Sequence, residues 1–170
     1  VRAFLLAHDT DPFNKWESGR ALAKEVLARM VTEGAEPGPD WLEALARVAL
    51  DESLDPAFRA LALRLPGEDD MAQTLHEAGV TPDPLAIHEA RRRMGRALAT
   101  RLRPLLPGLF EGLSEPGPFT PDAAQAGRRA LRNVLLALQA RIDGGAGAAA
   151  AFAGATNMTD SLAALVALLE

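Results

Sequence analysis

Helix-start signals recur along this chain and constrain its fold more than any other sequence feature. An aspartate or a threonine stands directly before a proline at several points, and apolar residues with helical spacing follow each of them. Such a side chain can cap the free N–H groups of a first helical turn, and proline fits the next position because its missing N–H costs nothing there. The starts are Asp11-Pro12, Asp55-Pro56, Asp83-Pro84 and Thr120-Pro121. We interpret them as a shared capping device and not as evidence of duplication.

Composition favours helix almost throughout the chain. Alanine and leucine dominate, tyrosine is absent, and valine, isoleucine and threonine are sparse in the 170 residues. These choices match helix propensity and not strand propensity. We therefore predict an all-α fold of antiparallel helix pairs in an α-solenoid of the armadillo or HEAT kind, with residues 1–170 as one helical domain. A four-helix bundle fits less well, because the expected helices are too numerous and too unequal in length.

The pattern predicts about nine helices. Asp40 and Glu43 are expected to form a capping box, and the helix that begins at Asp83-Pro84 is expected to be the longest and to end or kink at Pro104. Asn157 is expected to cap the last helix together with Asp160. The expected ranges are 1–8, 12–31, 40–50, 56–65, 68–77, 84–104 with a bent continuation to 110, 122–143, 147–154 and 158–169.

Two aromatic residues follow the first capped start. Phe13 and Trp16 share a helix face with Ala23, Leu27 and Met30. We expect both rings to be largely buried between neighbouring helices, since a ligand cage is the rarer use of such a pair.

Charge and cysteine content exclude several classes of protein. The net charge of −5 argues against binding nucleic acid with the whole surface. With no cysteine, the chain has no disulfide, no thiolate metal site and no cysteine nucleophile, which fits a reducing compartment. No apolar run of membrane-spanning length is free of polar breaks.

The three histidines do not form a recognisable metal motif. His76-Glu77 and His88-Glu89 each begin like the zinc motif His-Glu-x-x-His, but Val80 and Arg92 stand where the second histidine should be. His8 lies far away in the sequence. No nucleophile elbow or phosphate-binding loop occurs either. We expect no catalytic residue and no metal ligand in this chain, and the sequence names no substrate-binding residue.

One predicted helix is locally basic. We interpret its arginines as a solvated face or an interdomain contact, because they point around the helix and lack aromatic neighbours, and because Glu89 sits at pairing distance from Arg92 and Arg93. An RNA-binding helix is the weaker alternative. The arginines are Arg91, Arg92, Arg93, Arg96, Arg101 and Arg103.

Four segments, in order and with suitable spacing, resemble the helical C-terminal domain of bacterial aminopeptidase N, a family of gluzincin zinc exopeptidases. They are His8–Glu17 (HDTDPFNKWE), Leu65–Glu68 (LPGE), Ala126–Asn133 (AGRRALRN) and Ala155–Leu165 (ATNMTDSLAAL). The likeness extends over nearly the whole chain. It departs from the family pattern at Lys15, where arginine is expected, and in the Gly-Ala tract at 144–151.

The resemblance implies a larger cytoplasmic enzyme that removes N-terminal residues from peptides with a catalytic zinc. It also implies that the catalytic and β-sandwich domains precede Val1 and that this chain is the first part of the helical superhelix, serving as scaffold and as wall of the substrate chamber. The family's zinc ligands, general base and amine-binding motif have no matching positions here. The implied partners are the missing domains and the parent's peptide substrates, with no nucleic acid and no membrane.

The alternative is a free-standing helical-repeat module that binds a protein partner, which the fold class alone would allow equally. Because Val1 is no initiator methionine and Leu162–Leu169 ends inside an apolar pattern, we expect an excised segment. Leucine and valine side chains of this last helix should then be exposed.

Overall fold

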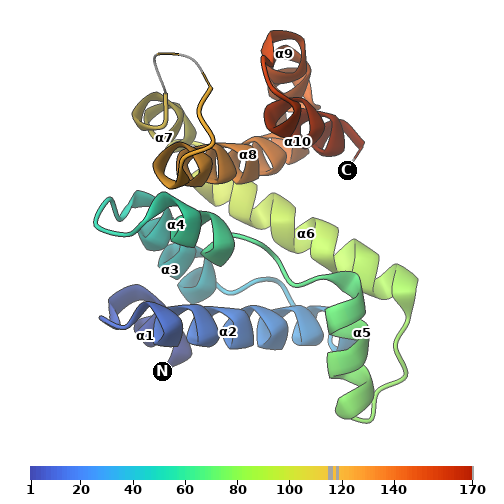
Figure 1. Cartoon of the computed structure of the whole chain (residues 1–170). Coiled ribbons are helices and arrows are strands. Elements are labelled where there is room, and N and C mark those ends of the chain that lie inside the picture. The colour runs from blue at the N-terminus through green and yellow to red at the C-terminus, as the bar shows by residue number, and fades with distance from the viewer. Residues whose placement is uncertain (115–116, 118, 170) are drawn as a thin grey trace.

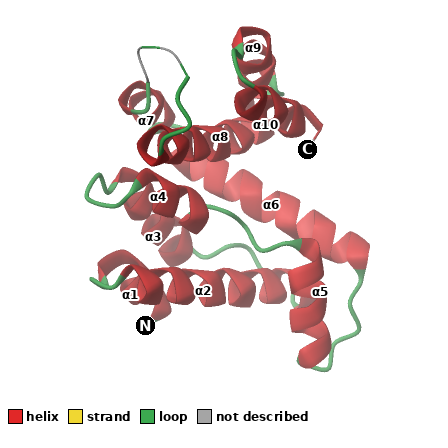
Figure 2. Cartoon of the chain, in the orientation of Figure 1, coloured by secondary structure: helices red, strands yellow, loops and turns green. Residues whose placement is uncertain are grey.

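A computed structural model describes residues 1–114, 117 and 119–169, and these residues form ten helices and no strand. The all-α prediction is therefore confirmed (Figures 1 and 2). The helices are α1 (Arg2–His8), α2 (Pro12–Thr32), α3 (Pro39–Leu50), α4 (Pro56–Ala62), α5 (Glu68–Glu77), α6 (Pro84–Leu102), α7 (Leu106–Gly112), α8 (Ala123–Asp143), α9 (Ala146–Gly154) and α10 (Met158–Leu169). The stretch between the helices expected to end near 110 and to begin near 122, rich in glycine and proline, is expected to be a loop, and its residues 115, 116 and 118 lie outside the described residues.

The predicted caps at three helix starts are confirmed. Asp11 accepts a hydrogen bond from the backbone N–H of Asn14 at 2.9 Å, and Asp55 accepts one from Ala57 at 2.7 Å. Asn157 accepts one from the backbone N–H of Asp160 at 2.9 Å. Each bond satisfies an N–H group that has no partner within its own helix.

Three boundary predictions are wrong. The capping box fails because α3 begins at Pro39 with Gly38 before it, so Asp40 already lies inside the helix, and Glu43 instead binds Arg101 at 2.7 Å. α6 is not the longest helix, because it has 19 residues whereas α2 and α8 have 21 each, although it ends just before Pro104 as expected. α4 ends at Ala62, three residues early. The described residues contain ten helices and not nine, because α7 is separate from α6.

α6 lies at the centre of the fold. It contacts α2, α3, α5 and α8, and in Figure 1 it runs diagonally between α1 to α3 on one side and α8 to α10 on the other. Met94, Leu98 and Leu102 on this helix are fully buried. A smaller apolar cluster joins the last helices, and it consists of Leu136, Ala148, Ala164 and Ala167. Its small side chains permit the close packing of α8, α9 and α10.

The structure corrects the expected burial of the two aromatics. Phe13 is 65% exposed because it lies in the first turn of α2, where that face is open to solvent. Its ring stacks at a tilt against Trp16, which is half-buried, with 6.0 Å between centroids. Trp41 of α3, at 2% exposed, is the indole that fills the core.

We expect Trp41→Ala to destabilise the fold far more than Trp16→Ala. Truncating a fully buried tryptophan costs about 3 to 5 kcal/mol, whereas a half-buried ring loses only part of that packing. Chemical denaturation of both variants measures the difference, with Phe13→Ala as an exposed control. Equal losses at Trp16 and Trp41 would contradict the burial described here.

The last helix exposes apolar side chains, as the sequence predicts. Leu162, Leu165, Val166, Leu168 and Leu169 are all exposed on α10. Such a patch favours association because burying it removes apolar area from water.

Association of this chain through α10 is therefore expected to rise with concentration. Sedimentation velocity over a concentration range should show it, and Leu162→Glu with Val166→Glu should abolish it. A double variant at two exposed positions away from α10, such as Arg64→Glu with Arg128→Glu, should leave it unchanged. A chain that stays monomeric at all concentrations contradicts this expectation.

Candidate functional site

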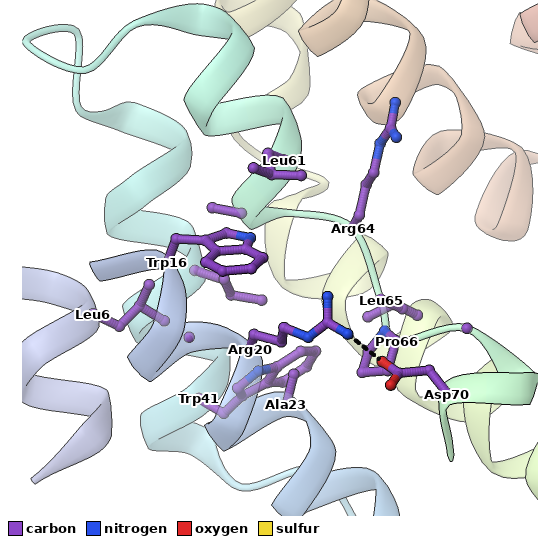
Figure 3. A pocket seen from close by; sticks show the side chains of 14 residues that line it. Leu6, Trp16, Arg20, Ala23, Trp41, Leu61, Arg64, Leu65, Pro66 and Asp70 are labelled. Carbon is purple, nitrogen blue, oxygen red and sulfur yellow. Dashed lines mark hydrogen bonds and ion pairs between the residues drawn. The ribbon is translucent and has the colours of Figure 1, made fainter. Parts of the chain in front are cut away.

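A recess of about 210 Å³ opens where α1 to α5 meet (Figure 3). Its polar side chains include Arg20 and Asp70, and much of its wall is apolar. The apolar lining consists of Leu6, Ala23, Trp41, Leu45, Leu61, Leu65 and Pro66. The recess is therefore a mostly apolar pocket at a junction of helices, bordered by an ion pair.

A glycine permits the close contact of α1 with α2 on one side of this recess. A Cβ atom added to Gly19 would lie 2.8 Å from Leu6 Cδ1, and Leu6 is fully buried. Real Cβ atoms do not approach other carbons so closely, so any larger residue at position 19 would displace Leu6. Gly19 thus lets α1 cover α2 at the edge of the pocket.

An ion-pair network holds α5 against α2. Arg20 contacts Asp70 Oδ2 at 3.0 Å, and Lys24 contacts Asp70 Oδ1 at 2.6 Å. The Arg20 guanidinium also lies over the Trp16 ring, 5.5 Å from its centroid. In Figure 3, Arg20 points at Asp70, whereas Arg64 points away from the pocket. These contacts position Trp16 and join two segments that are about fifty residues apart.

The lining of the recess has no group suited to catalysis. Both oxygens of Asp70 are held by cations, and the lining has no serine, threonine, histidine or cysteine. It therefore presents neither a nucleophile nor a free general base. Trp41 Nε1 is buried and has no hydrogen-bond partner among the described residues, which is unusual for a protein interior.

A second polar junction ties α8 to α10. The Asp160 carboxylate accepts hydrogen bonds from Arg132 at 2.6 Å, from Asn133 at 3.2 Å and from Asn157 at 2.8 Å. Partial burial raises the pKa of Asp160, but the Asn157 bond and the Arg132 charge outweigh it, so the pKa lies below its ordinary value. Beside it, a groove of about 450 Å³ extends along α8 and α9.

The four segments of the resemblance meet in pairs at these two junctions. Trp16 from His8–Glu17 lines the recess together with Leu65, Pro66 and Gly67 from the second segment. Arg132 and Asn133 from the third segment bind Asp160 from the fourth. These residues of the four segments therefore maintain helix contacts and do not assemble a reactive centre.

The histidines are dispersed. His8 stacks on Phe4 with 4.7 Å between ring centroids, His76 lies in the last turn of α5, and His88 Nδ1 lies 2.9 Å from Glu68 Oε1. Across residues 1–114, 117 and 119–169, no three histidine or carboxylate side chains group as a metal site would require. The expected absence of a metal site remains a prediction for the chain as a whole.

The arginines of α6 divide by role. Arg91 donates to the Pro66 carbonyl at 2.9 Å and thus supports the loop before α5. Arg93 donates to the Ala35 carbonyl at 3.1 Å, and Arg101 pairs with Glu43. These three side chains bind other elements. Pairing with Glu89 was expected for Arg92 and Arg93, but neither forms an ion pair with it within the described residues. No helix in the described part of the chain combines the length and apolarity that crossing a membrane needs.

Comparisons with known proteins identify the family to which this helical chain belongs. The sequence profile described as "Domain of unknown function (DUF3458_C) ARM repeats" matches residues 1–170. The chain belongs to this family. Its ARM-repeat description agrees with the predicted helical solenoid.

The curated relatives of this DUF3458_C chain include two bacterial enzymes. It is 38% identical over 169 residues to "Aminopeptidase N" of Caulobacter vibrioides and 30% identical over 172 residues to "Aminopeptidase N" of Escherichia coli K12. Each alignment covers 96% of this chain and 19% of the relative, so the chain spans about a fifth of their length. The resemblance to the helical C-terminal domain of bacterial aminopeptidase N is confirmed.

A solved structure shares the fold. The crystal structure of Legionella pneumophila aminopeptidase A in complex with aspartic acid superimposes with a TM-score of 0.81. It is 24% identical and covers 99% of this chain and 21% of its own.

Sequence reasoning missed Arg20 and Asp70 as members of the recess. Their separation along the chain gives no local signal, and only packing of α5 on α2 brings them together. The spacing of Trp16, Arg20 and Lys24, each four residues apart on one helix face, was the available hint.

We expect Asp160→Asn to destabilise the DUF3458_C chain by about 1 to 3 kcal/mol at neutral pH, because it weakens a charge-assisted junction. The lowered pKa means that ionised Asp160 stabilises the fold above the unfolded pKa, and that this contribution disappears as pH falls through the folded value. Denaturation from pH 7 to pH 2.5 should thus show the wild type and the variant converging in acid.

Asp69→Asn is the matched control for this experiment. Asp69 is exposed in the first turn of α5. Its replacement should cost a few tenths of a kcal/mol through the helix dipole. If Asp160→Asn cost no more than this control, the junction would not stabilise the fold.

Proposed function

We propose that this chain is the non-catalytic helical part of a zinc-dependent aminopeptidase N that removes N-terminal residues from peptides. The chain would serve as a scaffold and as a wall of the substrate chamber, in contact with the catalytic and β-sandwich domains of the same protein, in the cytoplasm. The observation that carries the proposal is 38% identity to a fifth of the Caulobacter vibrioides aminopeptidase N.

The contacts of the described residues favour a non-catalytic, scaffolding role. The recess where α1 to α5 meet is lined mostly by apolar side chains with the Arg20–Asp70 ion pair at its edge, and the two polar junctions hold helices together. A zinc site does not fit these residues, because the three histidines lie on three different helices without shared partners. The zinc of the proposed parent would therefore be held outside this chain, as would the residues that contact the scissile bond.

A free-standing helical-repeat module remains the second candidate. The exposed apolar face of α10 favours it, since a partner protein could cover that face. The two candidates differ in whether this chain can replace the matching segment of an aminopeptidase and keep that enzyme active. A domain exchange therefore distinguishes them.

The experiment replaces the matching segment of Caulobacter vibrioides aminopeptidase N with this chain. We expect the chimera to bind zinc and to hydrolyse an aminoacyl chromogenic substrate within about tenfold of the natural enzyme, since relatives at this identity keep the same core packing. The isolated 170-residue chain, assayed after dialysis, should contain no stoichiometric zinc and show no turnover.

The control chimera carries an unrelated helical-repeat segment of the same length and should lose activity. If the chimera with this chain folded but were no more active than that control, the aminopeptidase proposal would fail in favour of the free module. One zinc per isolated chain with measurable turnover would contradict the non-catalytic role.

A further inference from the structure

A basic groove lies along the exposed face of α6. One hollow of about 310 Å³ is lined by Glu89, Arg92, Arg93, Arg96 and Arg141. We call these four arginines and their hollow the arginine groove. An adjoining hollow of about 510 Å³ shares Arg93 and Arg96 and continues the groove along α6 to Arg101.

Two of its guanidinium groups are not used by the fold. Arg93 reaches the Ala35 carbonyl and lies 3.9 Å from Glu36, so it anchors the loop between α2 and α3. The side chains of Arg92 and Arg96 are exposed and form no ion pair or hydrogen bond within the described residues. They lie four residues apart and so occupy one face of the helix.

A glycine fixes the far wall of the groove. A Cβ atom added to Gly95 would lie 3.0 Å from Arg141 Nε and 3.1 Å from its Cδ. Gly95 therefore lets the Arg141 side chain of α8 lie directly across α6. This placement brings a guanidinium from a second helix beside Arg92 and Arg96, in a chain whose net charge is −5.

The shape and lining favour a peptide over other anions. From Glu89 to Arg101 the helix rises about 18 Å, which is the length of an extended peptide of five or six residues. The lining of the second hollow includes Leu42 and Ala97, which suit aliphatic side chains, and Glu36, whose charge is met by Arg93 at 3.9 Å. Neither hollow has an aromatic lining residue for stacking bases, and guanidinium groups bind carboxylates through paired hydrogen bonds.

We infer that the arginine groove binds an extended acidic peptide segment, with Arg92 and Arg96 contacting its carboxylates. The inference stands on residues of this chain alone and does not depend on the aminopeptidase proposal. It assigns a role to Arg92 and Arg96, the two arginines of the groove that no contact within the described residues requires.

Binding is tested on the 170-residue chain with a fluorescein-labelled hexaglutamate peptide, by fluorescence anisotropy at low salt. Hexaglutamate should bind, and labelled hexaglutamine should bind at least tenfold more weakly. Arg92→Gln with Arg96→Gln should weaken hexaglutamate binding about tenfold, the size expected for losing two exposed charge pairs. Higher salt should weaken binding, because exposed charges are screened.

Arg64→Gln with Arg128→Gln is the matched control, since both side chains are exposed outside the groove and the net charge changes equally. It should change affinity less than twofold. An equal loss in the control would mean non-specific attraction and would overturn the inference. Tighter binding of a labelled hexathymidine through Arg92 and Arg96 would overturn it too, in favour of nucleic acid.

Charge reversal gives a positive test that does not depend on loss of binding. Arg92→Glu with Arg96→Glu should reject hexaglutamate and bind labelled hexalysine, because the carboxylates would then face the peptide's cations. Circular dichroism of each variant should match that of the wild type, since both positions are exposed. A folded reversed variant that binds neither peptide would contradict direct contact through these two positions.

Discussion

The burial of α6 is the constraint on which the rest of the structure depends. Helices α2, α3, α5 and α8 all pack on it, and Met94, Leu98 and Leu102 lie in the resulting core without exposed surface. Closely packed interiors respond to the loss of even one methylene group, so these contacts fix the relative positions of both halves of the chain. The two faces of α6 therefore differ in character. One is apolar and covered, and the other carries the exposed Arg92 and Arg96.

Polar contacts set the details that the apolar core leaves undetermined. The Asp70 pair with Arg20 and Lys24 positions α5 on α2, and the Asp160 junction positions α10 on α8. The residues of the second junction, Arg132, Asn133 and Asp160, come from two of the segments that resemble aminopeptidase N, whereas Arg20, Lys24 and Asp70 lie just outside them. Such half-buried carboxylates bind only in the correct geometry, so they select one arrangement among several that burial alone would allow.

The recess and the arginine groove show which properties can be predicted from the sequence and which require the contacts between helices. The arginines were visible as a cluster, but their division into anchored and unpaired side chains required the positions of Pro66, Ala35 and Glu43. Phe13 and Trp16 were correctly placed on one face of one helix, yet the periodicity could not tell which turn of that face a neighbour would cover. Trp41, in a helix whose start was misread by one residue, proved to be the buried indole.

The all-α class, most helix starts and the family resemblance could be predicted from the residues alone. These follow from local causes, since capping residues, proline and helical periodicity act within a few positions of the chain. The packing of the helices determines which faces are covered, how closely neighbours approach Gly19 and Gly95, and which of the charges are neutralised. Those properties depend on contacts between residues far apart in the chain, such as Arg20 with Asp70, for which no local pattern exists.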